Sequence, residues 1–195
     1  MDQHVYDIAQ LASDLKRVRT ECHEEKEILG KVRVLACRAA ASKESWLTKR
    51  MYEADEEQGF GVHLLHEEAD HTLAIFAVSW LPDRGTTPHD HGTWAVVVGI
   101  DGPEKNEFWE RTDQRDRPGH AELKKIGEKV FHFEDVLAMP AGTIHSVWND
   151  SDRVTVSLHI YGKHVNYTGR SQFDPVKMTE TPYILRTQES LTTDN

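Results

Sequence analysis

The chain is poor in cysteine, in basic residues and in long apolar segments. Its two cysteines, Cys22 and Cys37, are too few for a disulfide framework. Acidic residues outnumber basic ones by 33 to 23, and the formal net charge of -10 argues against a nucleic-acid-binding face. No apolar run approaches the ~20 residues of a membrane helix, and the first residues lack the basic and apolar regions of a signal peptide. We therefore expect a cytoplasmic protein that binds neither nucleic acid nor membranes.

The length of 195 residues suits one domain, 1–195, with a helical N-terminal segment at 1–55, a β core at 62–162 and a C-terminal extension at 163–195. Near the start, apolar residues recur at steps of three and four, as a helix requires: Val5, Ile8, Leu11, Leu15 and Val18. Two more helices are expected at 24–41 and 42–54. The extension is polar, and Pro175 and Pro182 predict no regular structure there. Residues 187–195 are predicted to be disordered.

The middle of the chain changes to short apolar runs separated by turn residues. These runs lie at 72–80, 94–100, 106–111, 130–133, 136–139, 146–148 and 154–161. Many short strands at near-regular spacing, interrupted by Gly, Pro and Asp, are typical of an all-β barrel or jelly roll. The polar stretch 114–118 is predicted to be a hairpin loop. The expected fold class is therefore mainly β, with an N-terminal helical segment.

Three histidines stand where a metal site could form. His89 and His91 are two residues apart before an apolar run, and on a strand that spacing places both imidazoles on one face. His145 follows a turn made by Pro140 and Gly142. Three neutral nitrogen ligands leave open positions on a metal, as in catalytic sites. The alternative is that these are ordinary histidines of β strands.

These segments resemble the two motifs of the cupin superfamily, whose fold is a double-stranded β-helix. The second motif is matched in full by Pro140, Gly142, His145 and Asn149, and the first by His89, His91 and Gly102. Ala95, or Val96 at the longer spacing, stands where the first motif has a glutamate ligand. A site without that carboxylate can accept an anionic thiolate with less repulsion, and its loss is a hallmark of the thiol dioxygenases that oxidise cysteine and mercaptopropionate.

A further segment, Ser157-Leu158-His159-Ile160-Tyr161, resembles the Ser-x-His-x-Tyr triad of the same enzymes. Alternate residues of a strand share a face, so Ser157, His159 and Tyr161 can form one hydrogen-bonded chain. Without the resemblance, the segment would be a half-buried strand with paired polar residues. The resemblance implies one ferrous ion per chain, O2 as co-substrate and oxidation of a small thiol to its sulfinic acid, with these three residues as catalytic groups.

The residues expected to contact the substrate depart from cysteine dioxygenases. The region that holds their carboxylate-binding arginine contains Gly61, Val62 and His63 here, which makes free cysteine a doubtful substrate. Arg170 resembles a downstream arginine of the mercaptopropionate branch, and a guanidinium can bind a carboxylate with two hydrogen bonds. A solvated surface arginine is the alternative. The sequence favours a mercapto acid or a cysteine-like thiol, with His63 and Trp94 as further candidate contacts, although Trp94 could equally be a core residue.

Mammalian cysteine dioxygenases also carry a cysteine that cross-links to the active-site tyrosine. Val96 occupies that position, so no thioether at Tyr161 is expected. Two other functions stay open at this point: a cupin metalloenzyme with a non-thiol substrate, and a metal-binding cupin without catalytic activity. The oligomeric state and the resident metal are also left open by the sequence.

Overall fold

A computed structural model describes residues 6–188. The start of the first predicted helix, at Val5, and most of the segment predicted to be disordered, 187–195, lie outside the described residues. No helix within the described range is long and apolar enough to cross a membrane.

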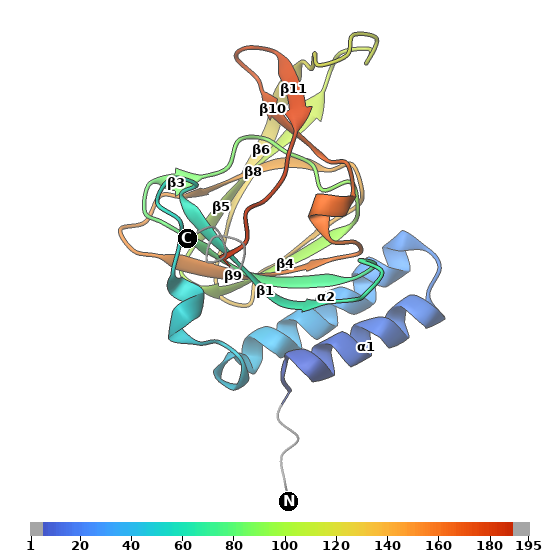
Figure 1. Ribbon diagram of the computed structural model, residues 1–195, viewed down its shortest axis with the longest axis vertical. Coiled ribbons are helices and arrows are strands. Elements are labelled where there is room, and N and C mark those ends of the chain that lie inside the picture. The colour runs from blue at the N-terminus through green and yellow to red at the C-terminus, as the bar shows by residue number, and fades with distance from the viewer. Residues whose placement is uncertain (1–5, 189–195) are drawn as a thin grey trace, which may run out of the picture.

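Two helices cover one face of the β core. Helix α1 (Ile8–Glu21) begins at Asp7, whose side chain accepts a hydrogen bond from the amide of Gln10, and α2 (Glu25–Ala41) follows after a short turn. Their buried faces pack with the outer face of a sheet, which Figure 1 shows as the helix pair below the strands. The core of this layer is formed by Leu11, Leu15, Val32, Ala36, Val96, Val98, Leu158 and Ile160.

The prediction of a third helix at 42–54 is wrong. The chain forms two 3-10 turns there, η1 (Lys43–Ser45) and η2 (Lys49–Tyr52). Trp46 is buried, and its indole donates a hydrogen bond to the carbonyl of Ala39. Ser45 donates to the carbonyls of Ser42 and Tyr6. These contacts fold the chain back on α2, and a continuous helix would lose them.

Two antiparallel sheets face each other. The first has the order β1-β2-β9-β4-β7 and the second β3-β8-β5-β6. The strands are β1 (Phe60–Glu67), β2 (Ala74–Trp80), β3 (Arg84–Gly85), β4 (Ala95–Asp101), β5 (Glu104–Arg111), β6 (Leu123–Phe131), β7 (Val136–Met139), β8 (Ile144–Asn149) and β9 (Thr155–Tyr161). Strands β2 to β9 divide four and four, which is the double-sheet arrangement of a jelly roll. The predicted fold class is confirmed.

Strand β6 is longer than the apolar run 130–133 that predicted it. It lies at the edge of the second sheet and is exposed along most of its length. Edge strands often carry charges that discourage further pairing, and β6 contains Lys124, Lys125, Glu128 and Lys129. Because neither face of this strand is consistently buried, its sequence has no apolar alternation. The polar stretch 114–118 lies in the connection between β5 and β6, as predicted.

The C-terminal extension also differs from the prediction, because it contains a β hairpin. Strands β10 (Ser171–Asp174) and β11 (Thr179–Pro182) pair in register. Pro175 lies in the turn and Pro182 ends the second strand, so neither proline interrupts the hairpin. After β11 the chain runs back toward the body of the barrel (Figure 1).

Candidate metal centre and its pocket

His89, His91 and His145 converge between the two sheets. Their candidate ligand atoms all lie within 4.8 Å of one another, and all three residues are buried. His145 is on β8, whereas His89 and His91 lie in the connection between β3 and β4 and not on a continuous strand. His89 is nevertheless fixed, because its amide and carbonyl exchange hydrogen bonds of 2.8 and 3.0 Å with the backbone of His145.

The hydrogen bonds of the rings leave nitrogens free at the centre of the cluster. Nδ1 of His89 donates to the carbonyl of Thr87 at 2.9 Å, and Nδ1 of His145 donates to Oδ1 of Asn106 at 2.7 Å. The Nε2 atoms of His145 and His91 face each other at 3.2 Å. Bonds of about 2.1 Å at angles of 90–109° around one metal ion would hold two ligand nitrogens about 3.0–3.4 Å apart. The trio could therefore hold a divalent cation.

Burial keeps the three imidazoles neutral. Burial, together with the smaller effect of the Arg170 charge, lowers the pKa of His145 to about 3. The pKa values of His89 and His91 are also well below the usual range, first because of burial and then because of the neighbouring histidine rings. A neutral imidazole is the form that binds a metal. No carboxylate belongs to the cluster within residues 6–188.

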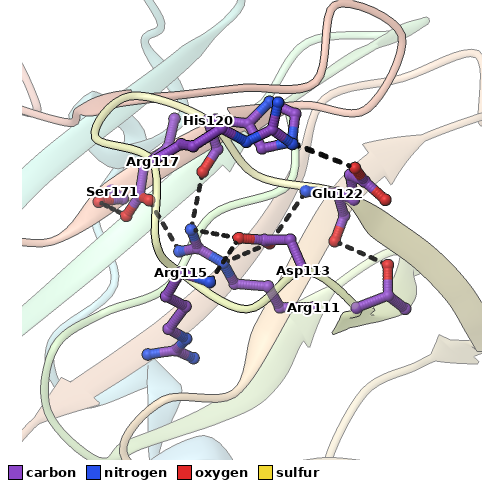
Figure 2. Close-up of polar contacts among 9 residues, drawn as sticks. Arg111, Asp113, Arg115, Arg117, His120, Glu122 and Ser171 are labelled. Atoms are coloured by element: carbon purple, nitrogen blue, oxygen red, sulfur yellow. Dashed lines mark hydrogen bonds and ion pairs between the residues drawn. The ribbon is translucent and has the colours of Figure 1, made fainter.

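The β10–β11 hairpin holds the loop that carries His89 and His91. The amide of Asp90 donates to the carbonyl of Ser171, and the amide of Ser171 donates to the Asp90 side chain. Glu180 of the hairpin also accepts hydrogen bonds from Ser171 and Arg111 at 2.8 and 2.7 Å. Figure 2 shows that Arg111 also binds Asp113 and the carbonyl of His120 in the β5–β6 connection. The extension therefore supports the histidine loop.

Ser157, His159 and Tyr161 form a continuous hydrogen-bonded chain on β9. The Ser157 hydroxyl is 2.8 Å from Nε2 of His159, and Nδ1 of His159 is 2.8 Å from the Tyr161 hydroxyl. All three are buried, because β9 is inside the first sheet, between β2 and β4. Tyr161 lies beside the metal cluster, with its ring centroid 5.1 Å from that of His91. Ala95 pairs with Tyr161 across the sheet and is also buried.

A small pocket opens onto the cluster and contains Arg170. None of the lining side chains in the described range is acidic: Phe60, Val62, Val78, Trp80, Thr86, His89, His91, His145, Val147, His159, Tyr161, Arg170, Tyr183 and Leu185. Arg170 is only 3% exposed, so it is not a solvated surface residue.

The guanidinium of Arg170 is incompletely paired. Its Nε donates to the carbonyl of Tyr183 at 3.2 Å, and its carbon lies 4.0 Å from the centre of the Tyr183 ring. Its Nη2 is buried without a hydrogen-bond partner among the described residues. Burial lowers the pKa of Arg170. A buried cationic donor without a partner is costly, and an anionic ligand in the pocket would supply the missing partner.

His63 and Trp94 do not line this pocket. On β1 the side chains alternate, so Val62 faces the interior while His63 lies on the other side and bonds the carbonyl of Glu53 at 2.9 Å. Trp94 packs in the core beneath the helices. Neither predicted substrate contact therefore belongs to the pocket that contains Arg170. Val96 belongs to the same helix-side core, as does Cys22, whereas Tyr161 belongs to the core between the sheets.

Four residues that contact the site were not anticipated from the sequence. Asn106 binds His145, and Glu104 connects Asn106 to Ser157. Tyr183 and Leu185 close the pocket from the chain that follows β11. A buried carboxyl and amide two residues apart on an otherwise charged strand resemble ordinary surface alternation, so the sequence carries no distinguishing signal for them.

No protein-family model matches the chain. Among solved structures, an oxalate oxidase is 14% identical with a TM-score of 0.46, over 64% of this chain and 61% of that one. Oxalate decarboxylase from Bacillus subtilis is 21% identical with a TM-score of 0.43, over 57% and 27%. The Cupin_2 domain of an XRE family transcriptional regulator from Enterobacter cloacae is 17% identical with a TM-score of 0.38, over 53% and 96%.

The chain spans 59% to 61% of the length of the oxalate oxidase chains that it matches. Likeness at this level says nothing about the reaction of the present chain, and the jelly-roll assignment rests on the strand order itself.

Proposed function

We propose that this protein is a non-haem iron dioxygenase of the cupin type that oxidises a small thiol to its sulfinic acid with O2. The proposal rests mainly on one observation: within residues 6–188, three neutral imidazoles converge without a carboxylate, beside a buried guanidinium that is incompletely paired. A cation bound by neutral ligands keeps its full positive charge, so it favours an anionic substrate. Ferrous iron would supply the one-electron chemistry that allows O2 to react with sulfur.

The substrate class follows from the two positive groups of the pocket. A thiolate suits the cation, and a carboxylate suits Arg170, whose planar donors can bind it with two hydrogen bonds. A mercapto carboxylic acid or a cysteine-like compound carries both groups on a short chain. The apolar walls offer nothing polar to the methylene groups, and the small volume excludes bulky thiols.

The chain of Ser157, His159 and Tyr161 would position a hydroxyl beside the reacting sulfur. Burial raises the pKa of Tyr161, which keeps it a phenol at neutral pH. The reaction R–SH + O2 → R–SO2H is balanced, because sulfur loses the four electrons that O2 takes up and both oxygen atoms remain on sulfur. No external reductant is needed. The role of the three residues is to hold a proton at the Tyr161 oxygen and to exclude water.

The test is a substrate panel with the iron-loaded protein. It compares two- and three-carbon mercapto acids and cysteine with cysteamine, which lacks a carboxylate, and with hydroxy acids, which lack sulfur. We expect one O2 consumed per sulfinate formed with the mercapto acids. Oxygen uptake with hydroxy acids and not with thiols would support a non-thiol metalloenzyme, and metal binding without uptake on any substrate would support a non-catalytic protein.

Two variants test the site itself. His145→Ala should abolish turnover and lower the iron content, because it removes one of three ligands. His132→Ala is the matched control, since the His132 side chain is 67% exposed. Turnover that survives in His145→Ala would show that the chemistry takes place elsewhere.

A further inference from the structure

Glu104 is a buried carboxyl group that neither joins the histidine cluster nor lines the pocket. We propose that the proton of Glu104 sets the tautomer of His159 and thereby decides whether Tyr161 donates or accepts a hydrogen bond in the pocket. Glu104 would be a positioning residue that acts through Ser157.

The contacts of Glu104 span the gap between the two sheets. Its Oε2 is 2.5 Å from the hydroxyl of Ser157 on β9, and its Oε1 accepts from the amide of Asn106 at 2.8 Å. Ser157 also accepts a hydrogen bond of 3.1 Å from the indole N–H of Trp80 on β2. The hydroxyl therefore has three neighbours besides its own carbon: Trp80, Glu104 and His159.

When Glu104 is ionised, it fixes the direction of each hydrogen bond from Ser157 to Tyr161. A serine hydroxyl has one proton to donate and two lone pairs that accept. An ionised carboxylate cannot donate, so Ser157 must give its proton to Glu104. Nε2 of His159 must then carry a proton and donate it to Ser157, which leaves Nδ1 as an acceptor. Tyr161 donates its own proton to that nitrogen, and its oxygen can only accept hydrogen bonds from the pocket.

The directions reverse when Glu104 is protonated. The carboxyl then donates to Ser157, whose two lone pairs are filled by Glu104 and Trp80. Ser157 must donate to Nε2 of His159, so the imidazole carries its proton on Nδ1 and donates it to Tyr161. The phenol proton is thereby freed to point into the pocket.

The surroundings of Glu104 favour the protonated form. Burial raises the pKa of Glu104 and outweighs the opposing hydrogen bonds from Ser157, Asn106 and Trp80. The groups that face it are thus a hydroxyl, an amide and an indole, and no charged side chain of residues 6–188 contributes to the shift. His159 stays neutral, because burial lowers its pKa to about 3. A change in the protonation of Glu104 therefore moves the imidazole proton from one ring nitrogen to the other without charging His159.

The same carboxyl also reaches the metal site by a second route. Asn106 donates to Glu104 through its amide nitrogen, so its oxygen is turned toward Nδ1 of His145 and holds Nε2 of that ring as a free ligand atom. This contact is the same in both forms of Glu104, because Oε1 accepts in either form. A change in protonation should therefore alter the phenol without releasing the metal.

The consequence for turnover rests on the proposed function. If the protonated form is the active one, the rate falls as the pH rises through the pKa of Glu104, because Tyr161 can no longer donate to the reacting sulfur or oxygen. Glu104→Gln mimics the protonated form: the amide oxygen would accept from Asn106 and the amide nitrogen would donate to Ser157. The turnover rate of this variant should therefore not fall as the pH rises.

The decisive measurement needs neither thiol nor O2. The full chain is loaded with zinc, which is diamagnetic, and long-range ¹H–¹⁵N NMR identifies the protonated ring nitrogen of His159 from about pH 5 to about pH 9, where buried glutamates can titrate. We expect Glu104→Gln to keep the proton on Nδ1 throughout. The wild type should match this variant at low pH and carry the proton on Nε2 at high pH. The midpoint of this tautomer change should equal the midpoint at which the ¹³C shift of the Glu104 carboxyl titrates.

Glu107→Gln on the same strand is the matched control, because Glu107 pairs with Lys125 and does not contact Ser157, His159 or Tyr161. The His159 tautomer of this variant should change with pH as it does in the wild type. If Glu104→Gln does not fold, the shared midpoint in the wild type and its loss in Ser157→Ala carry the test. Identical tautomers in wild type and Glu104→Gln at every pH, or different midpoints for the carboxyl and the ring, would overturn the proposal. If the NMR experiment gives the expected tautomers but the protein oxidises no thiol, the proposed function alone is refuted.

Discussion

Replacing Arg170 by methionine separates substrate binding from folding. The variant keeps most of the side-chain volume but removes the charge that lies unpaired in the pocket. A hydrogen bond to a charged group contributes about 1.5–3 kcal/mol. At about 1.4 kcal/mol per factor of ten, its loss should lower kcat/KM for mercapto acids by about 10- to 140-fold.

The free protein should change much less. Methionine loses the hydrogen bond of Nε to the Tyr183 carbonyl, but it also removes a buried charge that lacks a carboxylate partner. Within residues 6–188 no carboxylate forms a salt bridge with Arg170, so the two effects oppose each other, and we expect the free energy of unfolding to change by no more than about 1–2 kcal/mol.

The assay measures oxygen uptake for a mercapto acid and for cysteamine with wild type, Arg170→Met and Arg170→Lys, each at known iron content. Lysine keeps a point charge without the planar pair of donors and should recover part of the loss. Cysteamine has no carboxylate, so its kcat/KM should be nearly unaffected by methionine. An equal loss for both thiols at full iron content would refute the carboxylate role of Arg170.

Three further outcomes are expected. Tyr161→Phe should lower kcat by about 10²–10⁴-fold, the usual range for a proton-handling side chain, while iron content by metal analysis stays unchanged. Asn166 holds the chain at Leu185 by hydrogen bonds of 2.8 and 3.0 Å, so Asn166→Ala should raise KM more than it lowers kcat and should speed hydrogen exchange at Leu185. Burial and the Arg170 charge lower the pKa of His145 to about 3, so protonation of this ring competes with metal binding only near that pH. The zinc affinity measured by titration calorimetry should therefore vary little between about pH 6 and pH 8. A site of ordinary imidazoles would instead lose zinc affinity below about pH 6.5.

Local patterns in the sequence, together with the family resemblance, predicted the fold class and the six histidine, serine and tyrosine residues that the structure groups in the candidate site. Alternation along a strand is a local property, so Ser157, His159 and Tyr161 could be assigned to one face from their spacing alone. The turn at Pro140 and Gly142 likewise predicted that His145 would be directed inward. Such features depend on neighbours in the chain, and the sequence displays those neighbours directly.

The tertiary structure alone decided which other residues reach that site. Glu104 and Tyr183 approach it from β5 and from the chain after β11, so their proximity depends on how distant segments pack. His63 was predicted as a substrate contact, but the register of β1 with β2 directs Val62 toward the pocket instead. A shift of one residue along a strand reverses the face of every side chain, and that register is set by long-range pairing, which a single sequence does not display.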